Sequence, residues 1–410
     1  MQRRPFKIWF AITDPSFGPF GRYLNKFKDE LLRRGYKQQT IDARIRIARH
    51  LNGWFYRKKL SAKDLNEKTI RKFLKCYNKD HSNSFKKHSS PLRELLIWLR
   101  EQNIVPKPAI REGKFDYILN EYALYLERER GLSTATVKNY VLLIHCFLSK
   151  RFQKSEILLN NLTPADINKF IFEQTKVYSL SHVKTTTTAL RSFFIYLRFH
   201  GDIKVDLAAS VPTVADRSQV ELPKYLSTED VNKLLRSCDQ TRAVGIRDYA
   251  LLILMARLGL RTREILKITL DDINWETGIL TVHGKGGYQE QLPIPKDVGQ
   301  AIVAYLKKVR PKCDMRGLFV STKGPIKELT RNSLCSMVRH TCQRVGLSPP
   351  HQGPYLLRHS LATRMLREGV TMREIAEILR HRSLNTTRIY AKVDLKSLRE
   401  IAKPWPEIRS

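Results

Sequence analysis

The sequence predicts a mainly helical protein, with two helical modules followed by an α+β domain that carries a small antiparallel sheet. Two observations support this fold class. Apolar residues recur at helical spacing through most of the chain, including two upstream stretches that resemble each other. Between residues 272 and 295, two runs of strand-forming residues flank a glycine-rich turn, which is typical of a β-hairpin.

The two upstream modules are predicted from an internal repeat. Residues 35–40 align with 131–136, and residues 92–100 align with 190–198, so the offset changes only from 96 to 98 residues. Each copy has helical apolar spacing and predicts a unit of four or five helices. Three apolar residues of the first copy also match three of the second: Leu65, Ile70 and Phe73 match Leu162, Ile167 and Phe170.

Segments that contain proline and lack periodicity predict the domain boundaries. Residues 103–109 separate the two copies, and residues 205–225 separate the second copy from the rest. We therefore expect four parts in the chain: a first helical module at 1–110, a second at 111–204, a linker at 205–225 and a final domain at 226–410.

The charge predicts a polyanionic partner. The 410 residues carry a formal net charge of +35, and the isoelectric point is about 10.1. Binding to such a partner releases counterions and depends strongly on salt. RNA or an acidic membrane would fit the charge as well as DNA. Residues 1–110 hold 26 Lys and Arg against 9 Asp and Glu, a net charge of +17, so the first module is a candidate nucleic-acid grip. A solvated basic surface and a protein-binding surface are the alternatives.

The remaining composition predicts a reduced, cytoplasmic protein without a metal. The first apolar stretch is too short for a secretory signal, and no apolar run is long enough to span a bilayer. Six scattered cysteines form no evident disulfide framework. The nearest approach to a metal-ligand cluster is Cys335, His340 and Cys342, whose spacing favours packing in a helix over metal binding.

Two motifs place a basic residue at a turn. Arg261 follows an apolar helix that is predicted to end at Leu258, with Gly259 as its C-terminal cap, and precedes a new short helix. Lys285 lies at the Gly-Lys-Gly tip of the predicted hairpin, which lacks the longer loop and the following Ser or Thr of a Walker motif. Taken singly, Arg261 is as well explained as a solvated surface cation as by a functional role, and Lys285 is better explained that way.

Two later segments add candidates. Residues 354–366 suit an amphipathic helix with Arg358 near its start, where a bound anion would offset an unfavourable interaction with the helix dipole. Residues 374–391 predict a helix, a break near His381 and another short helix that carries Tyr390. A lone tyrosine there would ordinarily be a half-buried packing residue.

In this order the motifs resemble the tyrosine recombinase, or phage integrase, family. The resemblance is carried by Gly-Leu-Arg-x-x-Glu-Ile-Leu, the hairpin Gly-Lys-Gly, Leu-Arg-His-Ser-x-Ala-Thr and Leu-x-His-x-Ser-x-x-Thr-Thr-x-x-Tyr, and it covers roughly residues 225 to 395. The upstream copies are similar to the family's core-binding domain. The ordered coincidence of four motifs is far more specific than any one of them.

The resemblance implies a site that cuts DNA. In the family a tyrosine attacks the scissile phosphate and leaves a 3′-phosphotyrosyl link, and Tyr390 matches that tyrosine. Arg261 and Arg358 match the two arginines that stabilise charge on the phosphorane. His381 matches a histidine that binds a non-bridging oxygen, and Lys285 matches the general acid for the leaving 5′-oxygen. The resemblance implies no metal, ATP or other cofactor.

One position departs from the family pattern. The family usually has His-x-x-Arg where this chain has Tyr355-Leu-Leu-Arg358. A phenol is a much weaker base than imidazole at neutral pH, but it can still hydrogen-bond the phosphate or the nucleophile. We hypothesise that Tyr355 occupies this place in the site, with His359 or His351 as a compensating group.

The resemblance therefore implies a site-specific DNA recombinase of the integrase or transposase type. It would act as a homotetramer on two double-stranded DNA sites through a Holliday junction, associated with the nucleoid when bound to DNA. Residues 395–405 match the family tail that packs into a neighbouring subunit. A type IB topoisomerase-like enzyme and a catalytically weakened DNA-binding accessory protein are the alternatives. The sequence does not determine the DNA target, the biological task, the direction of recombination or the need for companion recombinases or accessory proteins.

Overall fold

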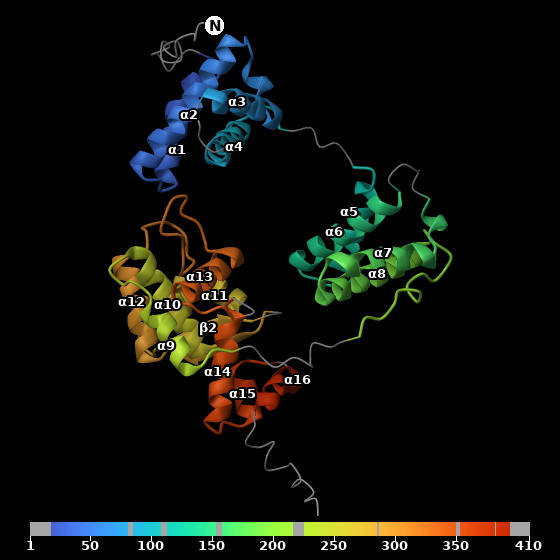
Figure 1. Ribbon diagram of the computed structural model, residues 1–410, viewed down its shortest axis with the longest axis vertical. Coiled ribbons are helices and arrows are strands. Elements are labelled where there is room, and N and C mark those ends of the chain that lie inside the picture. Colours follow the sequence, from blue (N-terminus) through green and yellow to red (C-terminus); the bar gives the residue numbers. More distant parts are fainter. Residues whose placement is uncertain are drawn as a thin grey trace, which may run out of the picture. The chain divides into compact units, whose positions relative to one another are not determined.

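The computed structural model describes residues 18–80, 85–107, 113–152, 158–215, 225–284, 287–349, 353–381 and 383–393. These residues are mostly helical, with one small sheet (Figure 1). Residues 108–220 form one compact unit, and residues 1–107 together with 221–410 form the other. Along the described part of the chain, no helix combines the length and the apolar character needed to cross a membrane.

The first module folds as a helical bundle around its own core. Its buried residues run from Phe20 to Val105 and recur at the helical spacing seen in the sequence. Its α-helices are α1 (Leu24–Arg33), α2 (Gln38–Arg57), α3 (Glu67–Asp80) and α4 (Phe85–Glu101).

The second module repeats this order of helices around a separate core. The core runs from Phe115 to Val211, so residues as far as Val211 within the predicted 205–225 linker pack onto this bundle. Thr163 caps the third helix, and Pro164 occupies its first turn, where a missing N–H is tolerated. The α-helices are α5 (Asp116–Arg128), α6 (Thr134–Arg151), α7 (Pro164–Val177) and α8 (Leu180–Phe199).

The aligned positions of the two copies take equivalent places. Gly35 and Gly131 both have positive φ, at 76° and 58°, where a side chain would be unfavourable. The three matched apolar pairs are buried in both cores: Leu65 and Leu162, Ile70 and Ile167, Phe73 and Phe170. The repeat read from the sequence therefore corresponds to two similar helical bundles.

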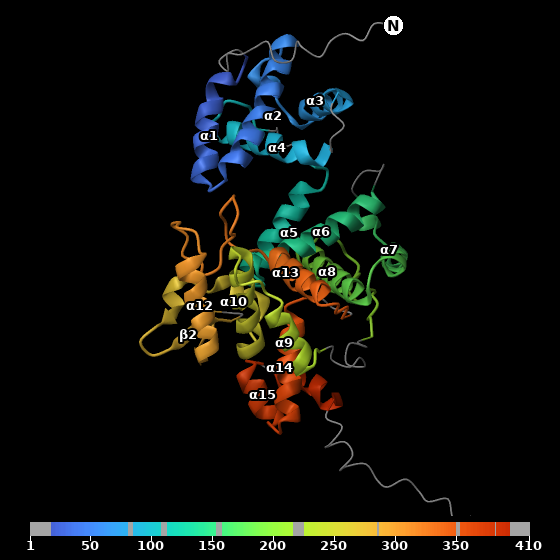
Figure 2. The ribbon, with the colours of Figure 1, turned by 60° about the vertical axis from the view of Figure 1, so that its left-hand side comes forward.

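The last part of the chain is helical with a three-stranded antiparallel sheet. Helix α10 packs against α12 and α14 (Figure 2), and its apolar residues form the centre of the core. The strands of the sheet are β1 (Ile273–Asn274), β2 (Ile279–His283) and β3 (Gln289–Pro293), in that order, with Leu280 opposite Leu292 and His283 opposite Gln289. The α-helices are α9 (Thr228–Arg236), α10 (Ala243–Leu258), α11 (Thr262–Lys267), α12 (Lys296–Lys308), α13 (Arg331–Arg344), α14 (Tyr355–Arg367), α15 (Met372–Ile378) and α16 (Leu384–Thr387).

The sheet lies where the sequence predicts it. The three strands run from Ile273 to Pro293, within the predicted span of 272–295. The described part of the chain ends in a 3₁₀ helix, η6 (Arg388–Val393). The predicted fold class, mainly α with a small antiparallel sheet, is confirmed. The division into four parts stays a prediction.

Candidate active site

Four of the predicted site residues come together in the last domain. Arg261 precedes α11, Arg358 lies in the first turn of α14, His381 follows α15, and Tyr390 lies in η6. They converge because α14, α15 and η6 share a small apolar core that includes Tyr390. Lys285 lies outside the described residues, as do His351 and the predicted tail at 395–405.

A glycine directs Arg261 into the site. Gly259 ends α10 with φ +56°, as the sequence predicts for a C-terminal cap. A Cβ at this position would lie 2.7 Å from a methyl of Leu379 and 2.9 Å from a methyl of Leu361. Gly259 therefore allows both the left-handed turn and the close approach of α10 to α14 and α15.

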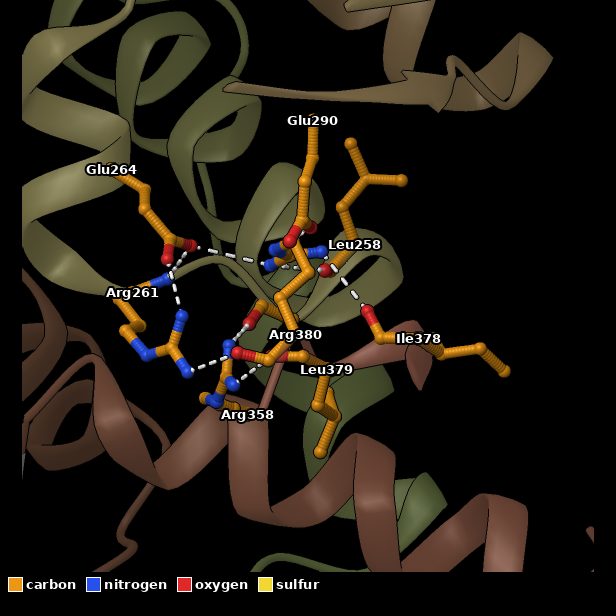
Figure 3. A network of polar contacts seen from close by, with 9 residues as sticks. Leu258, Arg261, Glu264, Glu290, Arg358, Ile378, Leu379 and Arg380 are labelled. Carbon is orange, nitrogen blue, oxygen red and sulfur yellow. Dashed lines mark hydrogen bonds and ion pairs between the residues drawn. The ribbon is translucent and has the colours of Figure 1, made fainter. Parts of the chain in front are cut away.

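Three arginines bind the carboxyl end of α15 (Figure 3). Arg380 Nη1 donates to the carbonyl of Ile378 at 3.0 Å, and Arg358 Nη2 donates to the carbonyl of Leu379. Arg261 Nη2 donates to the next carbonyl, that of Arg380, at 2.6 Å. The last carbonyls of a helix lack partners within it and carry the negative end of its dipole, so cations are favourable there.

The only carboxylate that contacts both Arg261 and Arg380 among the described residues is Glu264. Its side chain is 3% exposed and accepts from the Arg261 backbone N–H at 2.8 Å and from Arg261 Nη1 at 2.6 Å. Arg380 Nη2 donates to the same carboxylate at 3.2 Å. Burial alone would raise the pKa of Glu264, but the Arg261 backbone N–H and the charges of Arg380 and Arg261 hold it below its ordinary value.

Arg358 is completely buried. One end of its guanidinium donates to the carbonyl of Gly259 and the other to that of Leu379, while its Nε has no hydrogen-bond partner within the described segments. Burial, with the charges of Arg261 and Arg380, lowers the pKa of Arg358 to about 10. The side chain therefore stays charged at neutral pH, and its buried Nε–H has no acceptor among the described residues.

The phenol of Tyr390 pairs with His359. Tyr390 has no exposed surface, and its Oη lies 2.8 Å from Nδ1 of His359. Burial raises the pKa of Tyr390. Burial and the charge of Arg358 lower the pKa of His359 to about 4, so the imidazole is neutral at pH 7. A neutral imidazole at this distance can accept a hydrogen bond from the phenol.

Tyr355 and His381 flank this pair. Tyr355 is 47% exposed, and its ring meets that of His359 edge-on with centroids 4.3 Å apart. His381 Nδ1 hydrogen-bonds Thr387 Oγ1 at 2.7 Å, whereas its buried Nε2 has no partner in the part of the chain that the structure describes. Burial and the nearby arginines lower the pKa of His381 to about 4. When its ring proton is on Nε2, this unpaired nitrogen can donate a hydrogen bond to an anion.

The sequence did not point to Arg380 as part of this site, and it pointed only weakly to His359. Arg380 was not singled out, because an arginine after a helix is ordinary in so basic a chain. His359 entered only as a possible substitute for the missing histidine, although its place next to Arg358 was visible. Within the described residues, no group of three or more His, Cys, Asp or Glu could hold a metal ion. Cys342 is buried in the core, whereas His340 is exposed.

Comparison with known proteins decides the family. The phage integrase family profile matches residues 224–396, and the phage integrase N-terminal SAM-like domain matches residues 119–201. The chain is 38% identical over 402 residues to y4rA of Sinorhizobium fredii, an integrase/recombinase by name, covering 97% of each protein. It belongs to the phage integrase, or tyrosine recombinase, family.

Other tyrosine recombinases agree with this assignment. The chain is 31% identical over 293 residues to XerD of Listeria monocytogenes, covering 70% of this chain and 98% of XerD. The crystal structure of the XerH site-specific recombinase bound to its difH substrate has the same fold, with a TM-score of 0.51 and 24% identity over 70% of this chain and 85% of XerH. As a member of this family, the protein is an enzyme of DNA breakage and rejoining, and DNA is its partner.

The two depressed histidine pKa values predict how the stability of this recombinase depends on pH. His359 and His381 stay neutral in the folded protein down to about pH 4 but gain a proton near pH 6.5 when unfolded. Their contribution to stability is therefore complete above about pH 6.5 and is lost as the pH falls toward 4.

We expect His359→Gln to lower the pH sensitivity of the urea midpoint between about pH 7 and pH 5, because one of these protonations is removed. Equilibrium unfolding at both pH values measures the difference. Exposed His340→Gln is the control and should follow the wild type. Parallel pH dependence in all three proteins would contradict the prediction.

Proposed function

We propose that the protein is a site-specific recombinase that cuts and rejoins double-stranded DNA through a 3′-phosphotyrosyl link to Tyr390. The observation that carries this proposal is the 2.8 Å contact between Tyr390 Oη and the neutral imidazole of His359, beside Arg261, Arg358 and His381. A tyrosine next to a base and several cations suits in-line attack on a phosphodiester.

The bond changes balance without a metal or ATP. Tyr390 Oη forms a bond to phosphorus as its proton passes to Nδ1 of His359, and the bond from phosphorus to the 5′-oxygen breaks. That oxygen takes a proton. Lys285, which follows strand β2 in the sequence, is the candidate donor. The phosphotyrosyl link conserves the energy of the broken bond, so the reverse attack by a 5′-hydroxyl rejoins DNA.

Arg261, Arg358 and His381 would form a charge clamp, that is, the set of groups that binds the charged oxygens of the phosphate. Arg261 and Arg358 offer planar N–H groups to the equatorial oxygens, which carry the charge that builds up in the transition state. His381 offers Nε2 to a non-bridging oxygen. Because Arg358 and Tyr390 have no exposed surface, we infer that DNA binding shifts the segments around them before the phosphate enters.

His359 supplies the base that the family pattern lacks at position 355. Tyr355 stacks edge-on against His359 rather than facing Tyr390 in a hydrogen bond. We therefore assign Tyr355 to holding the imidazole and contacting the DNA phosphate, and His359 to taking the proton.

The assembly is proposed from the family mechanism. Strand exchange between two duplexes requires four active tyrosines, so we propose a homotetramer on two DNA sites that passes through a Holliday junction. Residues 395–405 would join neighbouring subunits. We also propose that the enzyme acts in the cytoplasm, where it would meet its DNA substrate. The relatives that match the chain are named recombinases and integrases, so neither a type IB topoisomerase-like enzyme nor a weakened accessory protein is favoured.

Covalent trapping tests the nucleophile. Purified protein is incubated with nicked suicide DNA substrates that carry candidate sites from its own genetic neighbourhood, and the products are separated on a denaturing gel. We expect a protein–DNA band with the wild type and none with Tyr390→Phe, because the phenol oxygen is the atom that bonds phosphorus. A band that survives in Tyr390→Phe would overturn this assignment.

Two variants separate the roles of His359 and Tyr355. We expect His359→Gln to slow single-turnover cleavage roughly 10²–10⁴-fold, the usual contribution of a general base. Tyr355→Phe should cost at most roughly tenfold, the value of one hydrogen bond. Equal losses would remove the distinction. A large gain of activity in Tyr355→His would instead indicate a site damaged at position 355.

The first module is proposed as a second DNA grip. It holds a net charge of +17 in residues 1–110, about half of the total. We expect removal of residues 1–110 to lower the affinity for a cognate site, shorten the footprint and reduce the salt dependence of binding, since fewer counterions are released. Footprinting and binding at several salt concentrations measure this. An unchanged affinity and footprint would contradict a DNA-binding role.

A further inference from the structure

Arg380 has a backbone conformation that disfavours its own side chain. Its φ is +56°, in the left-handed region where glycine is preferred. The conformation belongs to the turn that ends α15, because Arg380 N–H donates to the carbonyl of Glu377 at 2.9 Å and His381 N–H donates to that of Ala376 at 2.8 Å. This pair of bonds is a Schellman motif, whose left-handed residue is usually glycine.

The side chain that occupies this unfavourable position is nevertheless buried, and both of its Nη atoms donate hydrogen bonds, whereas Nε has no hydrogen-bond partner among the described residues. The side chain is 5% exposed and contacts groups from three other segments. Nη2 donates to Glu264 at 3.2 Å and to the carbonyl of Leu258 at 3.4 Å, and Nε lies 3.7 Å from the carboxylate of Glu290 in β3 (Figure 3). Backbone strain retained together with a buried charge points to a functional constraint.

We propose that Arg380 is a positioning residue of the active site. The carbonyl of Arg380 accepts from Arg261, and its side chain donates to the carboxylate of Glu264, which in turn binds Arg261. Its Nη1 donates to the carbonyl of Ile378, next to the Leu379 carbonyl that accepts from Arg358. Arg380 thus sets both arginines of the clamp without contacting the phosphate. It also adds positive charge, which offsets the carboxylate of Glu264 near the incoming anion.

Lys59 provides a matched control for the backbone effect. It has φ +54° and ends α2 with the same pair of hydrogen bonds, from Lys59 N–H to Tyr56 and from Leu60 N–H to Phe55. The residue is exposed and belongs to the first module. Lys59→Gly and Arg380→Gly therefore relieve the same left-handed strain, but only Arg380→Gly removes a side chain from the site.

The test compares these variants in single-turnover covalent cleavage with protein in excess over DNA. We expect Arg380→Gly to bind DNA within about twofold of wild type and to cleave about a hundredfold more slowly, the effect of a misplaced charge clamp. Arg380→Lys should recover part of the rate, because lysine restores a positive charge opposite Glu264 but lacks the two Nη donors of the guanidinium. At saturating protein Lys59→Gly should cleave at the wild-type rate, although the loss of one charge from the first module weakens its binding to DNA.

Three results would overturn the proposal: cleavage by Arg380→Gly within about threefold of wild type, a loss that disappears at saturating protein, or an equal loss in Lys59→Gly. Because the cleavage test rests on the proposed function, a crystal structure of Arg380→Gly provides an independent readout. We expect the guanidinium of Arg261 and the carboxylate of Glu264 to leave their present positions. Unchanged positions would refute the role of Arg380 whether or not the wild type cleaves a given DNA.

Discussion

The candidate active site depends on three consecutive carbonyls at and just beyond the end of α15. Those of residues 378, 379 and 380 bind Arg380, Arg358 and Arg261 in turn. The last carbonyls of a helix lack hydrogen-bond partners and lie at the negative end of its dipole. They therefore accept from guanidinium groups without neutralising the positive charge. The three arginines come from separate segments of the chain, and this shared acceptor surface is what brings their forks together.

Charge balance follows from the same arrangement. Carbonyls neutralise no charge, and among the described residues Glu264 is the carboxylate that pairs with both Arg261 and Arg380. The site thus keeps an excess of positive charge, which favours a phosphate. The depressed pKa values of His359 and His381 have the same origin, because each imidazole is buried near cations that oppose a further proton.

The pairing of Tyr390 with His359 shows how a departure from a family motif can be accommodated. The two residues of α14 that could approach the nucleophile, at 355 and 359, lie one helical turn apart on the same face. The ring at 355 packs edge-on against the imidazole at 359, and the imidazole reaches the phenol. A neutral imidazole therefore hydrogen-bonds the phenol of Tyr390, although position 355, where the family usually has histidine, carries a tyrosine.

The sequence alone predicted the helical class, the repeat and the hairpin, and it singled out Arg261, Arg358 and Tyr390 as candidate site residues, because apolar periodicity and motif order are local properties of the chain. Gly259 was also recognised as a helix cap, since caps depend on neighbouring residues. Tertiary structure decided the partners: which imidazole contacts Tyr390, that Arg380 lies buried with Glu264, and that Arg358 is completely enclosed. These relations join residues as far apart as Gly259 and Arg358, and only the packing of α10, α14 and α15 specifies which carbonyl meets which side chain.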